Sequence, residues 1–580
     1  MTREDAATIF ERIATLLEMQ GENPFKVRAY RTGAEVVESF SGDIMKLAAE
    51  NQLEGIKGLG EALRDKLHEM ATTGRLEFYE KLKAEFPDTI FELFDVQGLG
   101  PKKIAALHAE LGVSSISDLK RACESGEAAK LSGFGAKTVE KILESIAFHE
   151  QHASEFRQDQ VHALVQEILE ALRKHPNVSH AEICGSFRRG KETVHDLDFL
   201  VSTKQPDKII DYFVKLPVVV DVIAKGPTKA SIHATHGVQC DLRAVTSKEF
   251  AFALMYFTGS KEHNVAIRQR ALARGWSLNE YALTQVPDHA HAAVIPPVHD
   301  EADLYRALDL DFIDPELREN TGEIDAAEHG KLPRLVQLEN LRGVFHNHTT
   351  ASDGGGTLRE MAEAAHDLGL QYLGIADHSK SSFQANGLDE KRLRAQIKEI
   401  KTLNEEYADE GFRIFTGSEV DILKDGSLDF SDEVMAQLDY VVASVHNVFN
   451  LAEAEMTKRI IRAIENPNVT MLGHLTGRLL LQRPSYHVNV AAVIDAAAET
   501  GTIIELNASA WRLDMDWRWW KLAKEKGVKC SINPDAHSTR GLQDVVFGIK
   551  AARKGWLTRK DIINCLPLSE VEDVLKAKRG

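Results

Sequence analysis

Short apolar runs that end in histidine or acidic residues recur along the second half of this 580-residue chain. Runs of this length, separated by helical stretches, are typical of strands buried in a parallel sheet. Repeated strand-then-helix units predict a sheet closed into a barrel, with polar residues gathered at the carboxyl ends of its strands. The runs lie at 341–348, 372–376, 415–418, 440–445, 469–473 and 530–534.

The middle of the chain also carries apolar runs, which predict strands at 181–184, 198–201, 218–223 and 239–245. Asp196 and Asp198 are two residues apart at the start of one strand, so both carboxylates project from the same face. Asp241 in another predicted strand can complete a cluster of three acids. Such a cluster repels itself unless Mg²⁺ or Mn²⁺ lies among the oxygens. The alternative is an Asp-x-Asp pair that simply ends a solvated strand.

A turn at 185–190 favours the first interpretation. It offers backbone N–H groups, the hydroxyl of Ser186 and the guanidinium of Arg189, which together suit a triphosphate. Two metal ions about 4 Å apart would lower the pKa of an attacking hydroxyl and stabilise both entering and leaving oxygens. The pattern therefore indicates transfer of a nucleotide onto a growing chain.

Three segments near the amino terminus repeat one pattern, an apolar residue, then Gly-x-Gly, then an amphipathic helix. Two glycines at a tight turn leave the first N–H groups of the next helix open to a phosphate. A single Gly-x-Gly is more often a plain turn between helices, but three copies predict helix-hairpin-helix clamps on a DNA backbone. The glycines are Gly58, Gly60, Gly98, Gly100, Gly133 and Gly135.

Composition narrows the class of protein without deciding its partner. The length predicts three or more domains, and the 43% hydrophobic and 27% charged residues are ordinary for a soluble protein. We find no apolar run that would span a bilayer and no secretory signal, so we expect a cytoplasmic protein. The five cysteines are scattered, which fits a reducing compartment. The net charge of −18 argues against nucleic acid, although residues 151–300 hold equal numbers of basic and acidic side chains.

The motifs in the first half resemble those of a known family. Gly-Ser-x-Arg-Arg at 185–189 followed by Asp-x-Asp at 196–198 is similar to the signature of the polymerase beta nucleotidyltransferase superfamily. Tyr-Phe-Thr-Gly-Ser at 256–260, with His263 and Asn264, resembles the thumb motif of family X DNA polymerases. The resemblance covers residues 1 to about 316 and implies a DNA polymerase that uses dNTPs and gapped or primer-template DNA.

The same resemblance implies residue roles. Asp196, Asp198 and Asp241 would bind two catalytic Mg²⁺ or Mn²⁺ ions, with Asp241 as general base for the primer 3′-hydroxyl. His195 departs from the family pattern, which has glycine at this position. The property that this departure affects is the affinity for nucleotide, because the side chain either adds a phosphate contact or points to solvent. The implied contacts to the phosphates, sugar and base pair of the nucleotide are Gly185, Ser186, Arg189, Tyr256, Phe257, Gly259, Asn264 and Arg268.

The amino-terminal segment, including 25–31, resembles the DNA-end-binding domain of the family. In lyase-active relatives a lysine in the helix after the first hairpin forms a Schiff base with an abasic sugar, and Lys66 is the matching position. Such an amine needs a lowered pKa, whereas most helix lysines are solvated. We therefore rank lyase activity below polymerisation.

The second half resembles the PHP (polymerase and histidinol phosphatase) domain over about 341–570. Nine positions that match its metal ligands all carry a competent side chain, which implies three Mn²⁺ or Zn²⁺ ions and a 3′-5′ exonuclease, with AP endonuclease or other 3′-end processing as further possibilities. The positions are His346, His348, Asp353, His378, Glu419, His446, His474, Asp535 and His537.

The predicted protein is a multidomain α+β and α/β polymerase, monomeric and without a membrane partner, that fills short gaps in base excision repair. Three alternatives stay open: the PHP site is a small-molecule phosphatase, it is a structural module, or the chain is a DNA-binding scaffold. The expected domains are end-binding 1–90, helix-hairpin-helix 91–150, nucleotidyltransferase palm 151–246, thumb 247–316, linker 317–340 and PHP 341–580.

Overall fold

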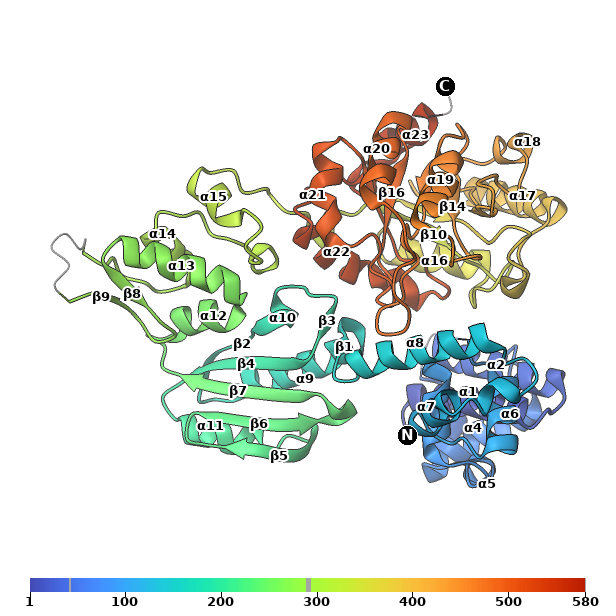
Figure 1. Cartoon of the computed structure of the whole chain (residues 1–580), viewed down its shortest axis with the longest axis horizontal. Coiled ribbons are helices and arrows are strands. Elements are labelled where there is room, and N and C mark those ends of the chain that lie inside the picture. Colours follow the sequence, from blue (N-terminus) through green and yellow to red (C-terminus); the bar gives the residue numbers. More distant parts are fainter. Residues whose placement is uncertain (41–42, 97, 288–293, 579–580) are drawn as a thin grey trace.

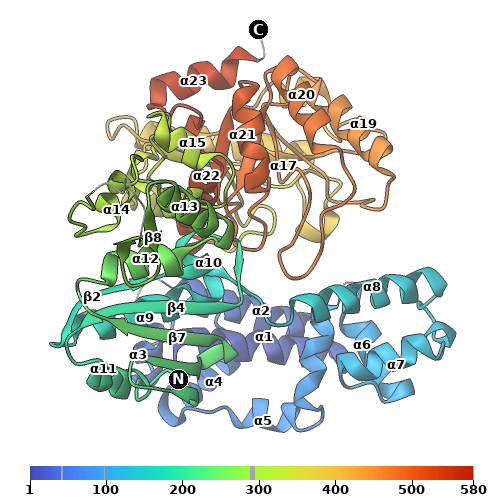
Figure 2. The ribbon, with the colours of Figure 1, turned by 60° about the vertical axis from the view of Figure 1, so that its left-hand side comes forward.

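The computed structural model describes the whole chain except residues 41–42, 97, 288–293 and 579–580. A helical amino-terminal region leads through the long helix α8 to a central sheet, and a helical thumb follows (Figure 1). The carboxyl-terminal half forms a separate strand-helix domain that lies against the palm and thumb (Figures 1 and 2). In the part of the chain described, no helix is long and apolar enough to cross a membrane.

The amino-terminal helices share one hydrophobic core that runs from Ala6 to Ile146. The regions expected as the end-binding and helix-hairpin-helix domains therefore pack against each other. Its helices are α1 (Arg3–Met19), α2 (Pro24–Ser39), α3 (Ile44–Ala49), α4 (Glu61–Thr73), α5 (Glu77–Lys83), α6 (Pro101–Leu111), α7 (Ile116–Glu124) and α8 (Ala136–His152).

The palm is a mixed sheet of five strands in the order β2-β4-β7-β6-β5, in which only β4 and β7 are parallel neighbours. Helices α9 (Gln158–Lys174) and α11 (Pro206–Phe213) contribute apolar residues to its core. Strand β6 was not expected, because its apolar residues are interrupted by Ser231 and His233. The strands are β2 (Val178–Ile183), β4 (Asp196–Thr203), β5 (Val219–Lys225), β6 (Lys229–Ala234) and β7 (Gln239–Val245).

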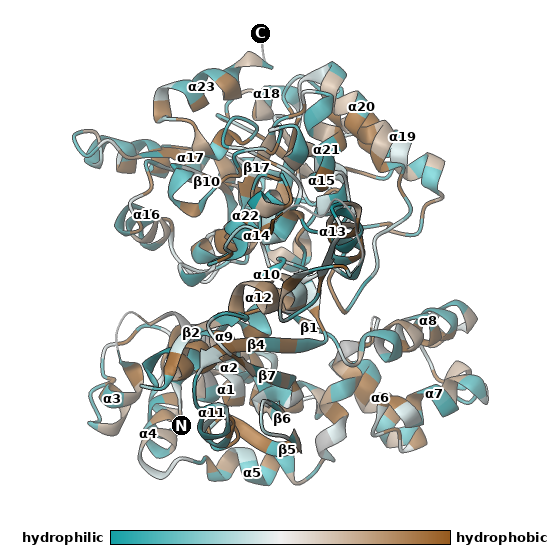
Figure 3. Ribbon diagram, turned by 90° about the vertical axis from the view of Figure 1, so that its left-hand side faces the viewer, coloured by the Kyte–Doolittle hydropathy of each residue, from teal (hydrophilic) through white to brown (hydrophobic). Residues whose placement is uncertain are grey.

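The thumb begins with the apolar helix α12 (Phe250–Thr258), brown in Figure 3, and continues through α13 (Lys261–Ala273), β8 (Trp276–Leu278), β9 (Leu283–Gln285) and α14 (Glu301–Ala307). The segment expected as a linker contains α15 (Glu323–Glu328), which packs into the thumb core. Buried Glu323 accepts a hydrogen bond from His263 Nδ1 at 2.7 Å.

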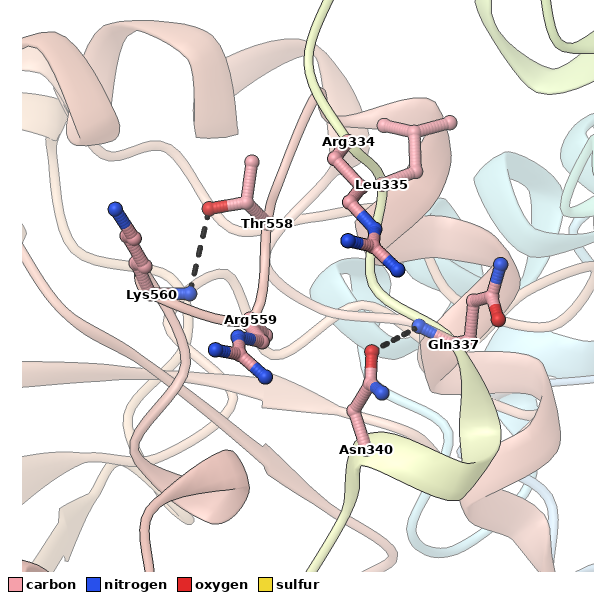
Figure 4. A pocket seen from close by; sticks show the side chains of 7 residues that line it. All are labelled: Arg334, Leu335, Gln337, Asn340, Thr558, Arg559 and Lys560. Atoms are coloured by element: carbon pink, nitrogen blue, oxygen red, sulfur yellow. Dashed lines mark hydrogen bonds between the residues drawn. The ribbon is translucent and has the colours of Figure 1, made fainter.

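The connection into the PHP domain is also fixed by contacts. The backbone N–H of Val336 donates to the carbonyl of Leu557, and Leu335 forms a bridge with Thr558. Between these paired segments lies a pocket that Figure 4 shows from close by. Its lining residues are Arg334, Leu335, Gln337, Asn340, Thr558, Arg559 and Lys560.

The PHP domain contains two parallel sheets, one of three strands and one of five. A single closed sheet was expected, but among the described residues isolated bridges connect the two sheets, Asn347 to Ala536 at one seam and His378 to Glu419 at the other. The strand at 503–507 was missed in the sequence because Glu505 and Asn507 interrupt its apolar run. The strands are β10 (Gly343–Asn347), β11 (Tyr372–Ile375), β12 (Arg413–Phe415), β13 (Glu419–Asp421), β14 (Val442–Ser444), β15 (Met471–Leu472), β16 (Ile503–Asn507) and β17 (Cys530–Asn533).

Helices pack around these sheets and complete the largest hydrophobic core of the molecule. Among them, α22 follows β17 and faces the palm and thumb (Figures 1 and 2). The helices of eight residues or more are α16 (Leu358–Asp367), α17 (Glu390–Glu406), α19 (Glu453–Ile464), α20 (Val490–Thr500), α21 (Trp517–Glu525), α22 (Val545–Lys554) and α23 (Leu568–Ala577).

Candidate active sites

The parallel strands β4 and β7 bring the three predicted palm carboxylates to one edge of the sheet. In their register Asp198 lies opposite Asp241, and Asp196 lies opposite Gln239. Burial, followed by the charges of Asp196 and Asp241, raises the pKa of Asp198 to about 7. Burial and the charge of Asp241 also raise the pKa of Asp196. Carboxylates that repel one another in this way fit a divalent cation, which would supply the missing positive charge.

Gly185 lets the predicted phosphate-binding turn approach these acids. Its φ is +60°, and a Cβ at this position would lie 2.5 Å from Asp198 Oδ2. Any other residue would therefore push the turn, which carries Ser186 in α10 (Gly185–Arg188), away from the carboxylate cluster.

The two arginines after this turn have different surroundings. Arg189 donates from Nε to Glu319 Oε1 at 2.9 Å and from Nη1 to the carbonyl of Thr258 at 2.6 Å. Arg188 instead pairs through both terminal nitrogens with the buried Glu301 on α14. Arg188 therefore joins the palm to the thumb, and Arg189 lies beside the predicted phosphate site.

The thumb motif places most of its predicted nucleotide contacts together. Asn264 donates from Nδ2 to the carbonyl of Tyr256 at 2.7 Å, and its Oδ1 is buried without a hydrogen bond. The rings of Tyr256 and Phe257 meet edge to face at 5.2 Å. A Cβ on Gly259 would lie 3.0 Å from Arg189 Nη1, so glycine keeps this approach open. Arg268 is exposed on α13.

His195 lies at the surface of the palm. Its side chain is 64% exposed, and its Nδ1 is 3.2 Å from the hydroxyl of Ser154. Its Nε2 is 3.9 Å from Glu155, in the connection between α8 and the palm. The large exposed fraction of the side chain favours the solvent-facing interpretation of this departure from the family pattern.

The three Gly-x-Gly turns share one geometry. Gly58, Gly98 and Gly133 have φ values of +89°, +89° and +84°, which favour glycine. The second glycines are the N-cap residues of α4, α6 and α8, and none of these helices has a side-chain hydrogen bond at its cap. The free amides at these helix starts suit a phosphate. The second glycines are Gly60, Gly100 and Gly135.

Lys66 lies on α4 and is only partly exposed. Its Nζ donates to the carbonyl of Ala62 at 3.3 Å and lies 5.1 Å from the ring of Phe78. Its role as a lyase nucleophile stays a prediction.

Glu419 at the start of β13 is the centre of the PHP site. Its carboxylate lies 2.9 Å from His378 Nδ1, 2.9 Å from His474 Nε2 and 3.1 Å from His446 Nε2. His346 Nε2 is 3.2 Å away. Five strands and the loops that follow them, from β10 to β15, thus bring these side chains to one point.

The remaining PHP positions complete three overlapping groups whose ligand atoms lie within 4.8 Å of one another. Within the described residues such groups occur only in this domain, so the palm acids are more widely spaced. The groups are His348, Asp353, His378 and His537; His346, His348 and Asp535; and His378, Glu419 and His446.

Buried polar atoms that lack a well-oriented hydrogen bond show that this cluster fits cations. The buried atoms His346 Nε2, His348 Nδ1, His378 Nδ1, His474 Nδ1 and Glu419 Oε2 have no hydrogen-bond partner. Such atoms are costly unless a ligand satisfies them. Burial lowers the pKa of His348 to about 4, which keeps its imidazole in the neutral form that binds a metal. Nitrogen and oxygen ligands together fit Mn²⁺ or Zn²⁺.

Glu505 is a site residue that the sequence analysis missed. It is fully buried on β16, and its Oε2 lies 2.5 Å from His346 Nδ1. Its oxygens also accept from Asn507 and Asn533, each at 2.9 Å. Asp421 holds His446 Nδ1 in the same way. A carboxylate within an apolar run was the available signal, and these acids orient the ligand imidazoles.

Two arginines near the PHP site behave differently. Arg512 lines the cavity of about 480 Å³ over the ligands, with Nε 3.4 Å from Asp535. Arg478 is 12% exposed and pairs with Asp516 and with Glu192 of the palm. Only Arg512 is therefore placed to meet a phosphate in this cavity.

Family models match the chain in the order that the folds suggest. Helix-hairpin-helix models match 1–76 and 90–147, the DNA polymerase beta palm matches 156–237 and the thumb matches 253–319. The PHP domain model matches 345–509.

One relative covers the whole chain. The DNA polymerase/3'-5' exonuclease PolX of Bacillus subtilis is 38% identical over 99% of this chain and 100% of its own length. The chain belongs to the PolX family. The predicted resemblance to family X polymerases with a carboxyl-terminal PHP domain is therefore confirmed. Other relatives match only part of the chain: a probable phosphatase of Thermoanaerobacter sp. is 30% identical over 40% of the chain and 94% of its own length.

Proposed function

We propose that this chain is a template-directed DNA polymerase whose palm extends a primer and whose PHP domain removes nucleotides from the 3′ end. The main support is the likeness to a PolX enzyme along the whole chain. The candidate ligands that the structure gathers in both halves agree with it.

In the polymerase half, Asp196, Asp198 and Asp241 would hold Mg²⁺ or Mn²⁺. These ions, when bound, would neutralise charge on the entering and leaving oxygens. Asp241 would accept the proton of the primer 3′-hydroxyl. The phosphates, sugar and base pair would be held by Gly185, Ser186, Arg189, Tyr256, Phe257, Gly259, Asn264 and Arg268.

In the PHP half, the nine ligand positions would hold three Mn²⁺ or Zn²⁺ ions. These ions would supply hydroxide from bound water and neutralise a phosphate under attack. Arg512 would bind the scissile phosphate, and Glu505 and Asp421 would keep the ligand imidazoles in place.

The cellular role we propose is short-gap filling in base excision repair, in the cytoplasm and as a monomer. The helix-hairpin-helix turns would hold the DNA backbone on either side of the gap. AP endonuclease, 3′-end processing and a lyase step at Lys66 are additional activities that this role would use.

A second candidate function for the PHP site is hydrolysis of a small phosphate monoester. The favouring observation is that two relatives named as probable phosphatases match 40% and 33% of the chain while covering 94% and 78% of their own length. Release of phosphate from histidinol phosphate without shortening of a labelled primer would support this alternative.

Two matched variants test the assignment of both sites. Asp198→Asn should lower one-nucleotide gap filling by more than about 100-fold, since even residues behind a metal ligand contribute 10 to 100-fold. It should leave removal of 3′ nucleotides near the wild-type rate. Asp353→Asn should show the opposite pattern.

Primer extension and shortening of a labelled primer, each in Mg²⁺ and in Mn²⁺, provide the measurements. Loss of both activities in either variant, with an unchanged thermal unfolding temperature, would contradict two independent sites. Unchanged gap filling by Asp198→Asn would show that Asp198 is not a catalytic ligand of the palm.

A further inference from the structure

Helix α22 of the PHP domain reaches the nucleotide-binding turn of the palm. The ammonium of Lys554, the last residue of this helix, donates to the carbonyl of Arg189 at 3.0 Å. Beside it, Lys550 Cβ lies 3.5 Å from the place where a Cβ on Gly190 would be. The end of the predicted phosphate cradle is therefore covered by the carboxyl-terminal domain, and α22 lies close to α10 in Figures 1 and 2.

The same lysine is joined to the guanidinium of Arg189 through one carboxylate. Lys554 Nζ donates to Glu319 Oε1 at 2.6 Å, and Arg189 Nε donates to that same oxygen at 2.9 Å. Glu319 is the last residue matched by the thumb model, so this link joins palm, thumb and PHP domain. Lys191 lies 3.6 Å from the other oxygen of Glu319.

These groups are shielded from water. The side chain of Lys554 is 0% exposed, and those of Glu319 and Arg189 are 10% and 13% exposed. The ammonium of Lys554 also lies 4.7 Å from the ring of Trp517. Charge-assisted hydrogen bonds are stronger in such surroundings than at the surface.

The hydrogen bonds fix one side of the Arg189 guanidinium. Nε is held by Glu319 and Nη1 by the carbonyl of Thr258, whereas Nη2 makes no hydrogen bond with any described residue. A planar guanidinium held at two nitrogens presents the third in a fixed direction. The cluster of Arg189, Lys554, Lys191 and Glu319 keeps a net positive charge, which suits a triphosphate.

We propose that Lys554 of the PHP domain is a positioning residue for nucleotide binding by the polymerase, acting through Glu319 on Arg189. The inference rests on the proposed function, because it takes Arg189 as a phosphate contact. It gives the PHP domain a second role that is independent of its own ligand cluster. In this chain the nuclease domain completes the wall of the polymerase site.

The test is a double-mutant cycle on the full-length protein. Lys554→Met and Glu319→Ala should each raise the KM and Kd for dNTP by about tenfold, in keeping with loss of a charged hydrogen bond, with a smaller change in kcat. The double variant should show about the same increase as one single variant, since both act through one link. Lys554→Arg should recover most of the affinity.

Lys524→Met is the matched control, because Lys524 binds only within the PHP domain, to Trp556 and Asp561. It should leave the dNTP affinity unchanged. Thermal unfolding of every variant separates loss of affinity from loss of folding. Nucleotide titration on gapped DNA gives the Kd apart from turnover.

The inference would be overturned if the increases in dNTP Kd caused by Lys554→Met and Glu319→Ala multiplied in the double variant. An unchanged dNTP Kd in folded Lys554→Met would also overturn it. Failure of the proposed function gives a different result. Arg189→Ala would then leave dNTP affinity unchanged, or wild-type protein would not extend a primer. If dNTP binding is weaker in Arg189→Ala but normal in Lys554→Met, the positioning role of Lys554 is wrong while the proposed function stands.

Discussion

Glu505 shows how much of the PHP site depends on single residues behind the ligands. It is not among the nine ligand positions, yet it contacts His346 and accepts from Asn507 and Asn533. A carboxylate in this position selects the imidazole tautomer and turns the free nitrogen of His346 towards the other ligands.

We therefore expect Glu505→Gln to lower removal of 3′ nucleotides by about 10 to 100-fold. The amide keeps the size of the side chain and loses the charge that holds His346. Metal content, measured by mass spectrometry after dialysis, should fall in parallel. The control is Glu499→Gln on the exposed side of α20, and equal effects of both variants would contradict this role.

At the scale of elements, the repeated glycine turns allow two kinds of DNA contact to be distinguished, contacts from backbone amides and contacts from charged side chains. Gly60, Gly100 and Gly135 start helices whose amides carry no side-chain cap, and a Cβ at each would meet open space. Alanine is therefore compatible with the fold, but its methyl group would stand where a phosphate approaches the amides.

Replacing these three glycines with alanine should weaken binding of gapped DNA by about tenfold, which corresponds to the loss of about one charged hydrogen bond in total. The unfolding temperature should not fall. Amides release no counterions, so the slope of log affinity against log salt should not change. Lys102→Ala, on the exposed side of α6, should instead reduce that slope by about one. Fluorescence anisotropy at several salt concentrations measures both, and a changed slope in the glycine variant would exclude amide contacts.

At the scale of the whole molecule, the palm and PHP domain meet across a cavity of about 1160 Å³ lined by residues of α9 and of the segment before α22. Burial, and then the charge of Asp159 across this seam, raises the pKa of Asp544 to about 6. Arg540 opposes this shift. The folded chain thus binds the proton of Asp544 more tightly than the unfolded chain does.

The sign of the pH effect follows from this difference. Ionised Asp544 destabilises the fold above about pH 6, and the penalty disappears below about pH 4, where it is protonated in both states. Asp544→Asn should therefore raise the unfolding temperature by about 1–3 °C at pH 8 and by little at pH 4. Scanning calorimetry at both pH values measures the unfolding temperature. The control is Asp573→Asn, at an exposed position. An equal gain at both pH values would indicate packing instead of charge.

The sequence alone determined the order of folds, because glycine turns, Asp-x-Asp and histidines at strand ends are local patterns that need few neighbours to be recognised. It also supplied the nine PHP positions and the three palm acids that we propose as ligands. It failed at strand β16 and Glu505, because polar residues that serve the site interrupt the apolar run.

Tertiary structure decided what depends on distant partners. The segment expected as a linker packs into the thumb because Glu323 pairs with His263, a contact across 60 residues that no local pattern records. Contact between Lys554 and Arg189 spans 365 residues. The sequence could place each residue in its own element, but only the packing of palm, thumb and PHP domain brings their charges to one carboxylate, since hydrogen bonds and burial act through space.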